Sequence, residues 1–340
     1  MESPLTIGYF ADGPWGRRAL TRIRNAPALT VQFIVGRHPE PDPALRDAAD
    51  EIGVPFYSVN NVNRPAFRDT IRRHGADVHV SMSFDQILEP AIIEMAPEGF
   101  INCHAGALPF YRGRNVLNWV LINGDDRFGV TVHEMEEQID TGDIVLQRFA
   151  EIEASDDYAS LLDKAATLCA DTLHDALLQL RDGTAERTPQ EDIHPVGFYS
   201  SKRRPGDEWI DWRQGSRRIH NFVRALVPPG PAARTRTGTT TLAILETDLI
   251  PGAPDYIDRP GTVVGTDEEG VVVKTGDNTI RVRRIAEVSE EGTLYRERVP
   301  SIPIGTELGE RPRQEIRRLR ARVEDLEERL RQDVSAETTP

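Results

Sequence analysis

Two hydrophobic periods alternate along the first half of the chain. Short apolar runs, typical of buried strands, alternate with stretches in which apolar residues recur at helical spacing. The expected strands are residues 5–10, 29–36, 54–59, 77–84, 99–104, 127–135 and 143–152. The expected helices begin near residue 17 and span 43–52, 64–74 and 156–181. This alternation predicts an α/β fold with a Rossmann-like, mostly parallel sheet and helices on both faces.

The pattern changes after residue 183. Prolines interrupt residues 184–207, which we interpret as a linker packed on the surface. A helix at 216–226 and short strands between turns follow, within 208–300. The expected strands are 239–248, 261–267, 270–276 and 279–285. This spacing predicts a small β-rich, OB-like second domain after a first domain at 1–183.

The last segment has a different repeat. Between residues 313 and 333 apolar positions are spaced 3, 4, 3 and 4 apart, at Ile316, Leu319, Val323, Leu326 and Leu330. Such a short heptad seam predicts a C-terminal helix. The helix either docks on its own protein or joins subunits in a homo-oligomer, and the sequence leaves both open.

Composition narrows the function classes. No run approaches the roughly 20 apolar residues of a membrane span, and the first residues lack the features of a signal peptide. Two cysteines offer no disulfide framework, which favours a cytoplasmic location. The formal net charge of −14 disfavours nucleic acid as a partner, because phosphate binding requires a basic face.

Candidate catalytic residues occur at the end of the expected strand at 99–104. Because side chains alternate along a strand, Asn102 and His104 share one face, whereas Cys103 points to the other and is interpreted as a core residue. Open α/β sheets bind ligands at the carboxyl edge of their strands. An amide and an imidazole there supply an oxyanion donor and a proton-transfer group. Asp140, in a turn before the next strand, can orient the imidazole.

These residues and their surroundings resemble the folate-dependent formyltransferases. The chain has Asn-x-His-x-x-x-Leu-Pro-x-Tyr-Arg-Gly from residue 102, and an Asp-x-Gly turn at 140–142. The resemblance implies that 10-formyltetrahydrofolate is the co-substrate and that Asn102, His104 and Asp140 are catalytic, with Asn102 and a protonated His104 stabilising the tetrahedral oxyanion. It also implies folate contacts from two loops, at Phe84, Gln86, Ile87, Leu88, Gln138 and Ile139. No metal is implied.

Three local features qualify the resemblance. Many relatives have serine where this chain has Gly106, which removes one hydrogen bond but leaves the turn possible. His133-Glu134 is superficially similar to a zinc-protease motif, but the second histidine is missing and the segment predicts a strand, so we expect no zinc site. Residues 12–16, Asp-Gly-Pro-Trp-Gly, are interpreted as a turn whose Trp15 can contact a ligand.

Formyltransferases of this family transfer the formyl group to an amine. Which amine accepts it is inferred from the branch of the family that the chain resembles. Segments 60–84 and 111–133 resemble sugar-nucleotide N-formyltransferases, which implies a nucleotide-linked aminosugar as acceptor. Its expected contacts are Trp15, Arg112, Arg114, Asn115 and Asn118, because arginines suit a diphosphate. Methionyl-tRNA formyltransferases carry a basic, glycine-rich insertion after the second strand, whereas residues 36–53 here are acidic. Methionyl-tRNA is therefore the alternative acceptor rather than the expected one.

Other acceptors and a non-enzymatic role stay open. Another small amine such as hydroxyornithine is an alternative acceptor, and hydrolysis of formyl-folate is a further alternative. The fold could also serve as a binding module that uses its C-terminal helix. The complete set of Asn102, His104 and Asp140 argues for an enzyme.

Overall fold

The chain forms two compact units in the computed structural model, which describes residues 3–309 and positions 320, 322, 323 and 326. Unit 1 comprises Met1–Asp207 and Ala225–Gly230, and unit 2 comprises Glu208–Arg224 and Pro231–Pro340. Residues 184–207, interpreted above as a linker, lie within unit 1. The expected helix at 313–333 lies outside the described residues, apart from the four single positions.

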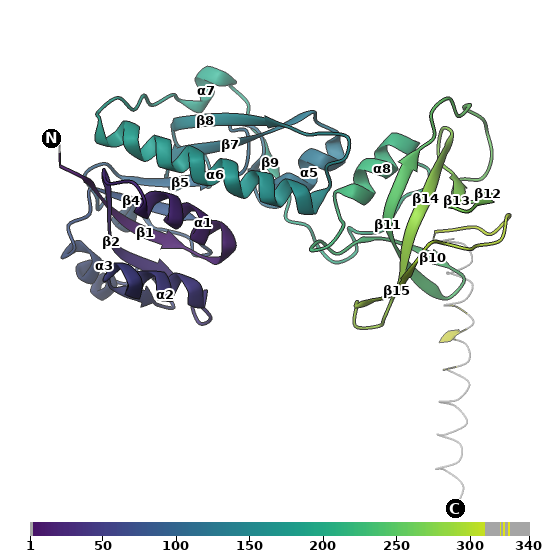
Figure 1. Ribbon diagram of the computed structural model, residues 1–340, viewed down its shortest axis with the longest axis horizontal. Coiled ribbons are helices and arrows are strands. Elements are labelled where there is room, and N and C mark those ends of the chain that lie inside the picture. Colours follow the sequence, from purple (N-terminus) through teal and green to yellow (C-terminus); the bar gives the residue numbers. More distant parts are fainter. Residues whose placement is uncertain (1–2, 310–319, 321, 324–325, 327–340) are drawn as a thin grey trace, which may run out of the picture. The chain divides into compact units, whose positions relative to one another are not determined.

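Unit 1 is built on a seven-stranded sheet in the order β3-β2-β1-β4-β5-β7-β8 (Figure 1). The pairs from β3 to β5 are parallel, and β7 and β8 add to the edge antiparallel. This arrangement confirms the predicted mostly parallel sheet. The strands are β1 Leu5–Ala11, β2 Leu29–Gly36, β3 Phe56–Ser58, β4 Val78–Met82, β5 Phe100–His104, β7 Arg127–Glu134 and β8 Ile144–Glu151. A separate two-stranded pair joins β6 Arg112–Gly113 to β9 Tyr199–Ser200.

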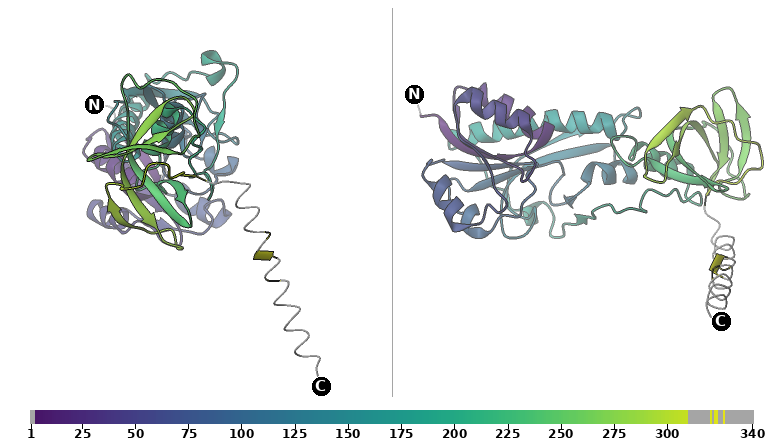
Figure 2. Two further views of the ribbon diagram at one scale, coloured as in Figure 1. Left: turned by 90° about the vertical axis from the view of Figure 1, so that its right-hand side faces the viewer. Right: turned by 90° about the horizontal axis from the view of Figure 1, so that it is seen from below.

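Helices cover both faces of this sheet (Figure 2). One core cluster joins the sheet to α1 Gly13–Arg24, α2 Pro43–Ile52, α5 Val116–Asn123 and α6 Tyr158–Arg181. A second cluster joins the opposite face to α3 Pro65–Arg72 and α4 Pro90–Ile93. The short helix α7 Gln190–Ile193 follows α6. No helix in the described part of the chain combines the length and apolarity needed to cross a bilayer.

Two local predictions in unit 1 are wrong. Residues 13–16 are the first turn of α1 rather than a turn before it, because Pro14 lies where a helix needs no N–H donor. Helix α5 was not predicted, because it is apolar on nearly all sides and therefore lacks the one-sided period of a surface helix. Both segments contribute to the candidate site, so these errors concern its walls.

Unit 2 is a β domain with one helix, α8 Ser216–Arg224, packed against β11. Its antiparallel sheet has the order β10-β11-β14-β13-β12, and β15 also pairs with β14 (Figure 1). The strands are β10 Ala233–Thr237, β11 Thr240–Leu249, β12 Val263–Asp267, β13 Gly270–Lys274, β14 Thr279–Val288 and β15 Leu294–Arg298. A second, β-rich domain is therefore confirmed, while its OB-like closure stays a prediction.

The central strand β4 carries a histidine in the core of unit 1. His79 is 3% exposed and lies among the rings of Phe10, Phe33 and Phe100. Its Nδ1 has no hydrogen-bond partner among the described residues. Burial lowers the pKa of His79 to about 4, although a backbone hydrogen bond involving Ile92 opposes the shift. The ring is therefore neutral in the folded protein at neutral pH.

This burial predicts a pH-dependent stability of unit 1. The pKa of an unfolded histidine is about 6.5, so the unfolded state takes up a proton that folded His79 refuses. The contribution of neutral His79 to the free energy of unfolding is complete above pH 6.5. It is lost as the pH falls towards 4, which lowers the free energy of unfolding by about 3 kcal/mol in total. Replacing His79 with leucine should remove this part of the slope in urea unfolding measured from pH 7.5 to 4. A matched change at exposed His38 should leave the slope unaltered; equal slopes for His79→Leu and the unmodified protein would contradict the assignment.

Candidate active site

The two expected residues of β5 lie at the carboxyl end of the parallel part of the sheet. In the antiparallel pairing with β7, Asn102 is directly opposite His133 and His104 is opposite Thr131. The alternation of side chains therefore places all four on one face. Cys103 points into the other face and joins the core cluster, as predicted.

Asp140 lies between two histidines. One carboxylate oxygen, Oδ2, is 3.7 Å from Nδ1 of His104, and the other, Oδ1, is 3.5 Å from Nε2 of His133. The backbone N–H of Gly113 donates a hydrogen bond of 2.8 Å to Oδ2. Asp140 itself has a φ of +57°, in the left-handed region. The structure thus brings Asn102, His104 and Asp140 together, as expected, and adds His133.

The amide of Asn102 is oriented by His133. Asn102 Nδ2 lies 3.2 Å from His133 Nε2, and His133 Nδ1 lies 2.7 Å from the carbonyl oxygen of Glu134. Because the carbonyl oxygen of Glu134 can only accept, Nδ1 of His133 carries a proton, and Nε2 faces both the Asn102 amide and the Asp140 carboxylate. In the sequence, His133 attracted notice only through its superficial similarity to a zinc-protease motif. Only the register between β5 and β7 places His133 opposite Asn102, and the pattern of apolar residues does not predict that register.

His104 is held by the turn that follows β5. Its Nε2 lies 2.7 Å from the carbonyl oxygen of Tyr111. Tyr111 has a φ of +56°, and its hydroxyl donates to Asp125. Thr131 accepts a hydrogen bond from Leu108 N and donates one to Gly106 O, which fixes the turn between His104 and Tyr111. The imidazole therefore has a defined orientation towards Asp140.

The charges of the site follow from burial and pairing. Burial opposes ionisation of Asp140, but the hydrogen bond from His133 and the nearby histidines lower its pKa to about 2. Burial lowers the pKa of His104, and this effect exceeds the opposing influence of Asp140 and of the Tyr111 carbonyl. The site therefore holds an ionised carboxylate beside His104, whose neutral form is favoured by burial in the enzyme without substrates.

A cavity of about 540 Å³ opens beside these residues, lined entirely by unit 1. The lining includes all the expected folate contacts, namely Phe84, Gln86, Ile87, Leu88, Gln138 and Ile139. Ile87 and Ile139 are 73% and 56% exposed, so apolar side chains face open space there. Leu88 is buried, and the amide of Gln86 bonds the backbone of Val59 and Val62.

The expected acceptor contacts are only partly brought to the cavity. Trp15, Arg114, Asn115 and Asn118 line it. Arg112 does not, because its guanidinium donates two hydrogen bonds to the side chain of Gln190. Asn118 is buried and donates to the carbonyl oxygen of Ala225. Among the described residues, no group of three or more His, Cys, Asp or Glu is placed to hold a metal ion.

Comparisons with known proteins identify the family of the chain. The formyl transferase family model matches residues 10–177, and the model of its C-terminal domain matches residues 202–291. A methionyl-tRNA formyltransferase from Geobacter metallireducens is 32% identical over 243 residues, which is 72% of this chain and 76% of that protein. The chain belongs to the formyltransferase family. As a folate-dependent formyltransferase, it carries out one-carbon transfer.

Solved structures of formyltransferases share the fold. An N-formyltransferase from Helicobacter canadensis, crystallised with folinic acid and dTDP-3-aminofucose, has a TM-score of 0.64 and 18% identity. That match covers 82% of this chain and 99% of the other. The sugar 3N-formyltransferase WlaRD, determined with dTDP and 5-N-formyl-THF, has a TM-score of 0.62 and 17% identity, covering 82% and 97%. At these identities the likeness concerns the fold alone.

The packing of His104 predicts the effect of a single methyl group. A Cβ built on Gly106 would lie 2.4 Å from His104 Nε2 and 2.7 Å from Tyr111 O. Gly106→Ala should therefore displace the imidazole and lower kcat roughly 100-fold, since shifts of about 1 Å have such effects. Gly265→Ala in β12, where an added Cβ would meet Val272 at an ordinary contact distance of 3.4 Å, is the matched control for a glycine substitution. A wild-type kcat in Gly106→Ala would show that activity does not depend on this position of the His104 imidazole.

Proposed function

We propose that this enzyme transfers a formyl group from 10-formyltetrahydrofolate to the amine of a nucleotide-linked aminosugar. The observation that carries the proposal is the group of Asn102, His104 and Asp140 beside a cavity that also exposes an unpaired arginine, Arg114. The guanidinium of Arg114 has no hydrogen bond or ion pair within residues 3–309, and its side chain is exposed. Arg114 is thus available for an anionic group of the acceptor.

The donor occupies the part of the cavity between the loops at 84–88 and 136–140. Exposed Ile87 and Ile139 offer apolar contacts to flat ring systems, and the backbone groups of both loops supply hydrogen bonds. The Helicobacter canadensis and WlaRD proteins, which share the fold, were crystallised with formylated folates.

The catalytic residues have distinct roles in the transfer. The acceptor amine attacks the formyl carbon, and the carbonyl oxygen takes the negative charge of the tetrahedral intermediate. Asn102 Nδ2 donates a hydrogen bond to this oxyanion. Neutral His104 accepts a proton from the attacking nitrogen, and the carboxylate of Asp140 stabilises the imidazolium. The proton then passes to folate N10 as its bond to the formyl carbon breaks, giving tetrahydrofolate and the N-formyl product.

Asp140→Asn tests this mechanism. Loss of the carboxylate should lower kcat by about 10²- to 10⁴-fold, because the imidazolium is no longer stabilised. It should also move the acid limb of the pH–rate profile to lower pH, since Asp140 raises the pKa of His104 against the larger effect of burial. Folate binding, measured by calorimetry, should persist. Asp69→Asn, an exposed carboxylate on α3, is the control; full activity in Asp140→Asn would refute the assigned role.

The charge distribution favours a small acceptor over tRNA. Both arginines of 36–53 are occupied: Arg37 pairs with Asp12 and Asp85, and Arg46 lies over the ring of Phe56. In the described part of unit 2, several strand arginines are paired with nearby carboxylates, such as Arg281 with Asp267 and Glu269. Further pairs of this kind involve Arg283, Arg284, Arg296 and Arg298. Such arginines are poor ligands for a phosphate backbone.

Methionyl-tRNA is the second candidate acceptor. The 32% identity with the Geobacter metallireducens enzyme favours it. Purified enzyme, 10-formyltetrahydrofolate and a panel of dTDP-, UDP- and GDP-linked aminosugars should yield, by mass spectrometry, a product heavier by one CO group. Charged initiator tRNA, assayed in parallel by acid gel, should remain unmodified. Formylation of the tRNA alone would overturn the aminosugar proposal in favour of the second candidate.

Arg114 provides a direct test of the acceptor class. If its guanidinium binds the diphosphate, Arg114→Ala should raise the KM for the nucleotide aminosugar by about tenfold or more, because a charge-assisted contact is lost. The KM for the folate should stay within twofold. Arg73→Ala, an exposed arginine on the far end of α3, controls for the change in net charge. An unchanged KM for the sugar would remove Arg114 from the acceptor site.

A further inference from the structure

A buried glutamine from outside the cavity contacts the turn that carries Asp140. Gln190, the first residue of α7, is 4% exposed. Its Nε2 donates hydrogen bonds to the carbonyl oxygens of Asp140 and Gly142, at 2.9 and 2.8 Å. Its Oε1 accepts from Nε and Nη2 of Arg112, at 3.0 and 2.6 Å. Both ends of the amide are therefore fully used.

The contacts of Gln190 complete a closed loop around Asp140. Arg112 directly precedes Gly113, and the N–H of Gly113 donates to the Asp140 carboxylate. The side chain of Asp140 is thus bound to one end of this dipeptide, while its backbone is bound through Gln190 to the other. The φ of +57° at Asp140 is unfavourable for a residue with a side chain. Aspartate tolerates this region better than most residues, and the hydrogen bonds from Gln190 stabilise it further.

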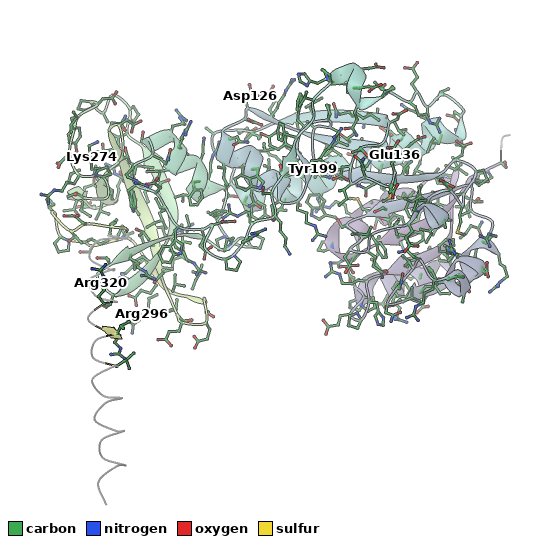
Figure 3. All side chains as sticks on the ribbon, turned by 180° about the vertical axis from the view of Figure 1, so that it is seen from behind. Asp126, Glu136, Tyr199, Lys274, Arg296 and Arg320 are labelled. Carbon is green, nitrogen blue, oxygen red and sulfur yellow. The ribbon has the colours of Figure 1, made fainter. Side chains whose placement is uncertain are left out.

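The surrounding segment, 188–200, holds the same turn at other points. Thr188 exchanges two backbone hydrogen bonds with Ile144, just after the turn. The hydroxyl of Tyr199 donates to the carbonyl oxygen of Ile139, just before Asp140. Figure 3 labels Tyr199 and, in the turn itself, Glu136. Gln190 supplies the contact at the centre, to Asp140 itself.

We infer that Gln190 is a positioning residue, which fixes the carboxylate of Asp140 towards His104 and so sets the activity of the catalytic group. This inference rests on the role proposed above for Asp140. A merely structural glutamine would contribute to stability alone. A positioning glutamine also alters the electrostatic coupling between Asp140 and His104, because that coupling depends on the distance between their side chains.

The test uses Gln190→Met, which keeps the length of the side chain and removes its hydrogen bonds. We expect kcat to fall by roughly 10- to 100-fold at temperatures well below the melting point, with the folate Kd within twofold. The pKa of His104, followed by NMR of histidine-labelled enzyme, should fall because Asp140 no longer raises it as strongly. Gln179→Met, on α6, is the matched control. A lower melting temperature with unchanged kcat and His104 pKa would overturn the inference.

A double-mutant cycle separates positioning from general damage. If Gln190 acts through Asp140, then Gln190→Met should change kcat by less than about threefold when Asp140 is already asparagine. An equal loss in both backgrounds would overturn the inference. Should Gln190→Met not fold, Arg112→Met removes the anchor of Gln190 without altering the turn. Arg112→Met should also lower the pKa of His104. An unchanged pKa would contradict a positioning role of Gln190.

The readouts distinguish this inference from the proposed function. The pKa of His104 is measured without any acceptor, so failure of every aminosugar would overturn the acceptor assignment alone. Full activity in Asp140→Asn would overturn the catalytic role of Asp140, and with it the inference. If the pKa of His104 in both Gln190→Met and Arg112→Met equals that in the unmodified enzyme, the inference is overturned and the proposed function is left intact.

Discussion

The ionised carboxylate of Asp140, held between His104 and His133, is the interaction on which the site depends. Burying a charge is unfavourable unless it is paired and hydrogen-bonded, and here the two histidines and the N–H of Gly113 supply those partners. The pKa of about 2 shows that pairing outweighs burial. Because the partners come from β5, β7 and the turn at 111–113, the charge also draws three separate segments to one point.

The parallel sheet and the catalytic strand follow from the sequence for physical reasons. Fully buried strands such as β4 appear as short apolar runs between turns, and the alternation along β5 places Asn102 and His104 on one face. The family resemblance then brings Asp140 to them. His133 and Gln190 could not be found in this way, because their roles depend on the register between β5 and β7 and on contacts between residues about 50 positions apart.

The walls of the site were harder to predict than its centre. Arg112 and Arg114 are two residues apart and look equivalent in the sequence, yet one donates to Gln190 and the other faces the cavity. Hydrogen bonds from distant segments make this distinction, and local pattern carries no information about them. The all-round apolar helix α5 was missed because its buried sides leave no polar face to reveal its period.

The cavity is assembled from segments that have little to do with one another in the chain. The loops at 84–88 and 136–140 form one part of its wall, and residues 113–118 with Trp15 form another. The candidate catalytic residues Asn102, His104 and Asp140 line the same cavity. Substitutions in 114–115 can therefore alter one wall without touching the strand ends or the opposite loops. On a scaffold of this kind, the specificity for the molecule that receives a group can change while the binding of the molecule that supplies it is retained.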